Sequence, residues 1–131
     1  MKQKSMFETF AVLKPNLGVD AVDVSPTLYA ELDKHYNKFN QHVLVSAHTF
    51  SQDWQVWEKH PAGDEIVMLL SGCCELVIRQ ASGEETQSLT SIGDFAIVPQ
   101  NLWHTARTST ATQLLFITPG ENTQNCDLDQ A

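Results

Sequence analysis

The sequence has no long hydrophobic run: its longest stretch of consecutive apolar residues, Ile66 to Leu70, is five residues long. A helix needs about 20 such residues to span a bilayer, so we expect no transmembrane segment. The N-terminal stretch MFETFAVLKP also lacks the uninterrupted apolar core of a secretory signal, because Glu8 interrupts it. These absences predict an unprocessed cytoplasmic protein that has no membrane partner.

Positive charge is scarce. The chain has 8 Lys+Arg against 16 Asp+Glu, which gives a formal net charge of −8. A protein with this balance repels the phosphate backbone of nucleic acids and the surface of anionic membranes. We therefore expect a small-molecule ligand or substrate as the partner, and no nucleic acid.

Cysteine is also sparse, with Cys73, Cys74 and Cys126 as the only thiols and no C-x-x-C spacing. An odd number of cysteines without a framework of pairs predicts no disulfides, and it is typical of a reducing compartment. Free cysteines behave as small buried apolar residues in most proteins. We expect that role here.

The 131 residues, 42% of them hydrophobic, fit one domain with a single core. A Ser-Pro pair at Ser25 precedes apolar residues spaced four apart, Leu28, Leu32 and Tyr36, which predicts a short helix within an N-terminal arm, residues 1–40. Short β-rich segments separated by Gly, Pro, Asn and Asp fill residues 41–119 and predict an all-β barrel or sandwich. The polar segment 120–131 is expected to be a loose tail. The expected strands are His42–Phe50, Trp54–Glu58, Glu65–Leu70, Cys74–Arg79, Glu85–Leu89, Phe95–Val98, Trp103–Arg107 and Gln113–Thr118.

Candidate metal ligands gather in two of these segments. Glu58 and His60 lie two residues apart and so project from the same face of a strand, and Glu65 can return to that face after the HPAGD turn. His104 follows the VPQN turn in a second apolar segment. Two imidazoles with one or two carboxylates suit iron, manganese, nickel, zinc or copper, and they leave positions open for water or substrate.

At these residues the chain resembles a small single-domain member of the cupin superfamily. The first cupin motif, His-x-His, then Glu, then Gly, is matched by His60, Glu65 and Gly72, with Glu58 at the position of the first His. In the second motif Gly93, Pro99 and His104 match, whereas Asn101 replaces a Gly and Thr108 replaces the final Asn. Asn tolerates the left-handed backbone conformation that a turn glycine adopts.

The resemblance implies a double-stranded β-helix, a jelly-roll barrel, with a divalent metal held by Glu58, His60, Glu65 and His104. It implies most directly a metal-dependent dioxygenase, in which Glu58 is either the fourth ligand or a general base. A metal-assisted isomerase would use the same residues, and a non-catalytic ligand-binding or sensor cupin is the alternative outside catalysis. Cupin-like barrels commonly pair, so we also expect a homodimer, to which the apolar positions of Phe7 to Val22 would contribute.

Several other side chains have a structural interpretation as well as a functional one. His42 and His48 share strand parity, and either could line a pocket wall or be an ordinary hydrogen-bonded histidine. The three tryptophans are expected to be core or interface residues, although one of them could border the pocket. Arg79 and Arg107 are opposite in parity to the inward residues, and we expect both to point outwards.

Overall fold

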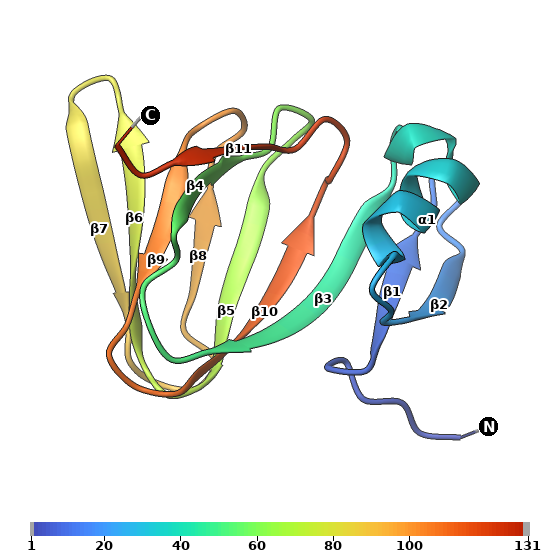
Figure 1. The fold of residues 1–131 in the computed structure, drawn as a ribbon, viewed down its shortest axis with the longest axis horizontal. Helices are drawn as coiled ribbons and strands as arrows, with labels where there is room; N and C mark the ends of the chain where they lie inside the picture. Colours follow the sequence, from blue (N-terminus) through green and yellow to red (C-terminus); the bar gives the residue numbers. More distant parts are fainter. Residues whose placement is uncertain (1, 130–131) are drawn as a thin grey trace.

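The computed structural model describes residues 2–129, which form two antiparallel β-sheets and one short α-helix (Figure 1). The helix α1 is Leu28–His35, and a 3-10 turn, η1, follows at Asn37–Phe39. The strands are β1 Thr9–Leu13, β2 Val19–Asp23, β3 Val43–Phe50, β4 Val56–Lys59, β5 Glu65–Ser71, β6 Cys74–Gln80, β7 Gly83–Leu89, β8 Phe95–Val98, β9 His104–Arg107, β10 Thr112–Thr118 and β11 Gln124–Asp127.

The main core lies between the two sheets. The six-stranded sheet has the order β2-β1-β3-β10-β5-β8, and the five-stranded sheet has the order β11-β4-β9-β6-β7. Alternating burial along β10 explains how a strand contributes: Leu114 and Phe116 point into the core, while Leu115 and Ile117 point outwards. The buried cluster combines β10 and β5 with β6 and β9 of the other sheet. This arrangement confirms the predicted jelly-roll class.

The eight strands predicted from the sequence are all present, with end positions that differ by at most a few residues. β8 has the predicted bounds, Phe95–Val98. Tight turns occur where the sequence has turn formers, and Gly72 illustrates why: its φ is +79°, and a Cβ there would lie 2.3 Å from the Ala111 carbonyl oxygen. Only glycine fits at that position.

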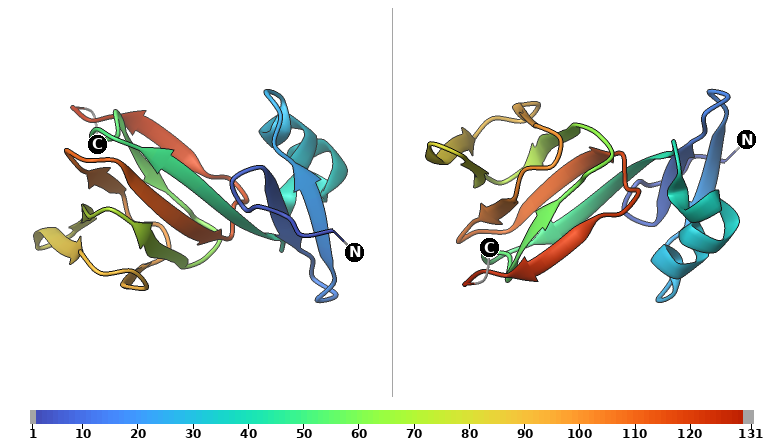
Figure 2. Two further views of the ribbon diagram at one scale, coloured as in Figure 1. Left: turned by 90° about the horizontal axis from the view of Figure 1, so that it is seen from below. Right: turned by 90° about the horizontal axis from the view of Figure 1, so that it is seen from above.

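The N-terminal arm contains more structure than the predicted helix. β1 and β2 form an antiparallel hairpin that extends the six-stranded sheet, and α1 covers its inner side at one end of the molecule (Figure 2). Leu28 and Leu32 of α1 pack with Phe10 and Val12 of β1 in a second core cluster. The helix therefore forms where it was expected, because its narrow apolar stripe has a partner surface.

The expectation of a loose C-terminal tail is wrong for residues 124–127. These residues form β11, which pairs with β4 in the register Asn125↔Glu58 and Cys126↔Trp57. The indole Nε1 of Trp57 also donates a hydrogen bond to the Leu128 carbonyl, at 3.0 Å. This polar segment has no apolar periodicity, and it forms a strand because it pairs with the backbone of β4.

The outer side of the six-stranded sheet has an apolar band, which we call the outer apolar face. One register row crosses all six strands and consists of Ala21, Ala11, Val45, Ile117, Ile66 and Ile97. A neighbouring row consists of Ala47, Leu115, Met68 and Phe95. Ile97 and Phe95 are 52% and 58% exposed. Neither row contains a charged residue.

Within residues 2–129, no helix has the length and apolar character needed to cross a membrane.

Candidate metal centre

The structure brings together all four side chains that the sequence singled out: Glu58, His60, Glu65 and His104. Glu58 lies on β4 and His60 directly follows that strand, while Glu65 is the first residue of β5 and His104 the first of β9. Glu58 and His104 are direct partners across the β4–β9 pairing. Because β5 belongs to the other sheet, the cluster lies between the two sheets.

The ligand-type atoms of this cluster are spaced as a metal requires. All four atoms lie within 4.8 Å of one another. Nε2 of His60 is 3.0 Å from Glu58 Oε1 and 3.2 Å from Glu65 Oε2, and Nε2 of His104 is 3.1 Å from Glu65 Oε1. Ligands about 2.1 Å from a metal, at right angles to one another, would be about 3.0 Å apart. The spacing therefore fits one ion.

Burial strengthens the fit. His60, Glu65 and His104 are 4%, 1% and 0% exposed, whereas Glu58 is 28% exposed on its side chain. Nε2 of His60, Oε1 of Glu65 and both ring nitrogens of His104 are buried and, within the described structure, form no hydrogen bond outside the cluster itself. Buried polar atoms without partners are costly. A cation coordinated by these atoms would remove that cost.

Two side chains orient the buried ligands. The Thr118 hydroxyl donates a hydrogen bond to Glu65 Oε2, at 2.5 Å. Thr123 Oγ1 lies 2.8 Å from His60 Nδ1 and donates its only hydrogen to the Gly120 carbonyl, at 3.0 Å. The Thr123 oxygen must therefore accept a hydrogen bond from the N–H at His60 Nδ1, which leaves Nε2 as the nitrogen that faces the carboxylates.

The electrostatics of the cluster follow from the contacts between histidine and carboxylate. Burial alone would lower the pKa of His60, but the nearby Glu58 and Glu65 carboxylates outweigh it and raise the pKa to about 9. Burial would raise the pKa of Glu65, but the two imidazoles outweigh it and lower the pKa to about 2. Without a metal, a proton on His60 therefore balances part of the carboxylate charge.

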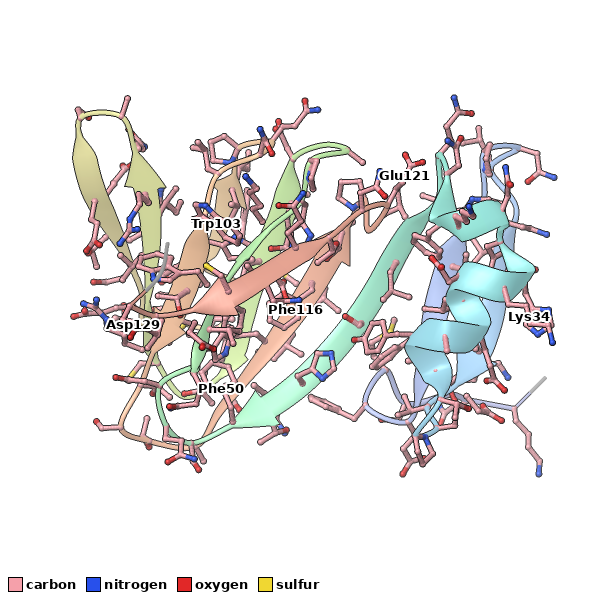
Figure 3. All side chains as sticks on the ribbon, turned by 45° about the horizontal axis from the view of Figure 1, so that its top comes forward. Lys34, Phe50, Trp103, Phe116, Glu121 and Asp129 are labelled. Carbon is pink, nitrogen blue, oxygen red and sulfur yellow. The ribbon has the colours of Figure 1, made fainter. Side chains whose placement is uncertain are left out.

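A cavity of about 650 Å³ opens next to the cluster. Glu58, His60 and Glu65 form part of its wall. Aromatic and aliphatic side chains from the helix and from both sheets form much of the rest; they are Tyr29, Leu32, Phe39, Leu44, Trp54, Val56 and Phe116. Figure 3 shows Phe116 near the middle of the molecule. The site thus combines ligand-type polar atoms with a cavity of mixed apolar and polar lining, large enough for a small organic molecule.

The remaining candidates divide between the cavity and the surface. His48 lines the cavity, between the rings of Phe10 and Phe116. His42 instead hydrogen-bonds the Asn40 carbonyl through Nδ1, at 2.7 Å. Asn101 has a φ of +65°, the left-handed conformation expected of it, and its N–H donates to the His60 carbonyl at 3.0 Å.

Trp54 lies at the cavity, whereas Trp57 and the two arginines lie on the other side of β4. Trp54 borders the cavity and makes an edge-to-face contact with the His104 ring. Trp57 lies on the opposite side of β4, where the Arg79 guanidinium stacks over its ring at 4.4 Å. Arg79 and Arg107 both line a separate pocket of about 180 Å³ there, away from the candidate metal centre.

Sequence reasoning missed Thr118 and Thr123. Thr118 has the same inward parity on β10 as Leu114 and Phe116, which was an available signal. Thr123 had no such signal, because it belongs to a polar segment whose position depends on the pairing of β11 with β4.

Neither a protein-family model nor a curated protein matches this chain. Solved structures do match it. A cupin-2 domain containing protein from Shewanella frigidimarina has a TM-score of 0.50 and 17% identity, and the match covers 59% of this chain and 70% of that one. A mutant of Bacillus subtilis oxalate decarboxylase has a TM-score of 0.53 and 17% identity, covering 67% of this chain and 24% of that one.

An oxalate oxidase in complex with the substrate analogue glycolate also matches, with a TM-score of 0.52 and 15% identity. That match covers 63% of this chain and 45% of the oxidase chain. Identities this low establish a shared fold and no shared activity.

Proposed function

We propose that this chain, which has the cupin fold, holds a divalent transition metal with Glu58, His60, Glu65 and His104 and acts on a small molecule in the adjoining cavity. The reaction class that we favour is dioxygenation, in which both atoms of dioxygen enter the product. One observation supports the proposal above the others: the unsatisfied buried atoms of the cluster face one another beside the cavity.

The chemistry of the ligand atoms limits which metals the site can bind. Two imidazole nitrogens and two carboxylate oxygens suit iron, manganese, nickel, zinc or copper. When bound, such an ion would supply Lewis acidity and open coordination positions, and a redox-active one would supply oxygen chemistry. The two carboxylates would cancel the charge of a divalent ion.

Glu58 differs from the other three residues, because its carboxylate is partly exposed and lines the cavity. We propose that it is either the fourth ligand or a general base beside the substrate, a role that requires a carboxylate within reach of the reacting proton. A metal-assisted isomerase would use Glu58 in the same way. The size of the cavity also favours a second candidate function, a non-catalytic cupin that binds or senses a small molecule.

Oxygen uptake separates these functions. Protein loaded in turn with iron, manganese, nickel, copper or zinc is incubated with thiols, diols and catechols in an oxygen-electrode cell. A dioxygenase consumes oxygen in proportion to product, and Glu65→Gln and chelator-treated protein do not. Product formation without oxygen uptake would support the isomerase, and binding without turnover would support the non-catalytic module.

We also propose a reducing compartment such as the cytoplasm. All three cysteines are free, Cys73 is exposed, and burial raises the pKa of the Cys74 thiol to about 11. Alkylation followed by mass spectrometry of protein taken directly from cells should find three reduced thiols. A disulfide in that sample would contradict the proposal.

A further inference from the structure

The charges around the cavity restrict what it can hold. Among the described residues that line it there is no lysine or arginine, whereas Asp33 and Glu58 contribute carboxylates next to the buried Glu65. Figure 3 shows Lys34 at the outer edge of the molecule, on the side of α1 away from β3. Among the described lining residues, no permanently charged cation is therefore available to pair with an anionic ligand.

The histidines do not supply the missing positive charge. Desolvation lowers the pKa of His48, which leaves its ring neutral at pH 7. His60 and His104 can bind a metal only through unprotonated nitrogens. With a divalent ion in place, its two charges are cancelled by Glu58 and Glu65, so the lining has no net positive charge.

Glu58, which stands where the first cupin motif has a histidine, determines the net charge of the metal-loaded centre. A histidine at position 58 would leave the loaded centre with one positive charge, and the glutamate that is present removes it. A neutral centre attracts a carboxylate or phosphate weakly, and Asp33 adds repulsion. The apolar walls formed by Phe39, Trp54 and Phe116 provide contact area for a ring instead.

We infer that the cavity selects an uncharged, flat, largely apolar molecule carrying hydroxyl or carbonyl oxygens, and that it disfavours small organic dianions such as oxalate. This inference rests on the proposed metal site. The ligand class that it assigns to the site is uncharged, whereas the oxalate named for two of the structural neighbours is an anion.

The test compares catechol with 3,4-dihydroxybenzoate, which has the same ring and diol but adds one carboxylate, and with oxalate. Binding to protein loaded with redox-inert zinc is measured by calorimetry without oxygen. We expect catechol to bind at least about tenfold more tightly than either anion. Glu58→His should narrow that ratio by about tenfold, whereas Glu31→Gln, which removes an exposed charge outside the cavity lining, should leave it unchanged.

The outcomes separate the two claims. A protein that takes up no metal overturns the proposed function, and with it this inference. A protein that holds zinc but binds oxalate as tightly as catechol, or binds no catechol, overturns the inference alone. If Glu58→His and Glu31→Gln change the ratio of catechol affinity to anion affinity equally, the inference is also overturned, because the preference for catechol would then come from the overall charge of the protein.

Discussion

Thr123 Oγ1 lies 2.8 Å from His60 Nδ1, so the C-terminal segment directly contacts a side chain of the candidate metal centre. The hydroxyl is itself fixed by its hydrogen bond to the Gly120 carbonyl. An imidazole held in this way presents Nε2 to the cluster in one ring orientation. Thr123 is therefore a positioning residue and not a ligand.

Replacing Thr123 by valine should weaken metal affinity by about tenfold without unfolding the protein, because the ring loses its orienting partner but keeps its place. Competition titration against a chelator measures the change. Thr123→Ser should retain the wild-type affinity, and Thr86→Val, at an exposed position on β7, is the matched control. Equal affinity for Thr123→Val and the wild type would show that the contact does not orient the ligand.

The metal-free protein should be most stable in mildly acidic solution. The folded-state pKa of His60, about 9, lies above its ordinary 6.5, so its contribution is complete below pH 6.5 and is lost as the pH rises towards 9. The folded-state pKa of Glu65, about 2, lies below its ordinary 4.5, so its contribution is complete above pH 4.5 and is lost as the pH falls towards 2.

Urea denaturation of chelator-treated protein should therefore give a maximum in the free energy of unfolding between about pH 4.5 and 6.5. Glu65→Gln should flatten the acid side of that profile. A stability that keeps rising from pH 6.5 to 9 would contradict the assigned pairing of His60 with the carboxylates.

Asn101 connects a turn to the candidate centre, because its left-handed backbone brings its N–H to the His60 carbonyl. Asn101→Gly should change the free energy of unfolding by less than about 1 kcal/mol, since glycine adopts this φ freely. Asn101→Val should cost about 1–2 kcal/mol, because a β-branched residue is strained there. Chemical denaturation measures both, and similar losses for the two variants would contradict this explanation.

The sequence predicts most of the sandwich because strand alternation and turn residues are local signals. The bounds of β8 and the shared face of Glu58 and His60 both follow from a period of two. The β1–β2 hairpin also had such a signal, alternating apolar residues around the turn that contains Pro15 and Gly18, although it was not predicted.

β11 had no local signal. Its residues Gln124–Asp127 are polar, and they become a strand because the edge of β4 offers unpaired backbone groups. The contact between Thr123 and His60 and the cavity between α1 and the sheets depend on tertiary arrangement in the same way. No pattern within one segment encodes them.

Elemental analysis of the purified protein tests the central claim most directly. We expect about one transition-metal ion per chain in the wild type and in His35→Ala, an exposed histidine on α1, and almost none in His60→Ala or His104→Ala. A wild type that contains no metal and cannot be reconstituted, or variants that keep a full equivalent, would contradict the account.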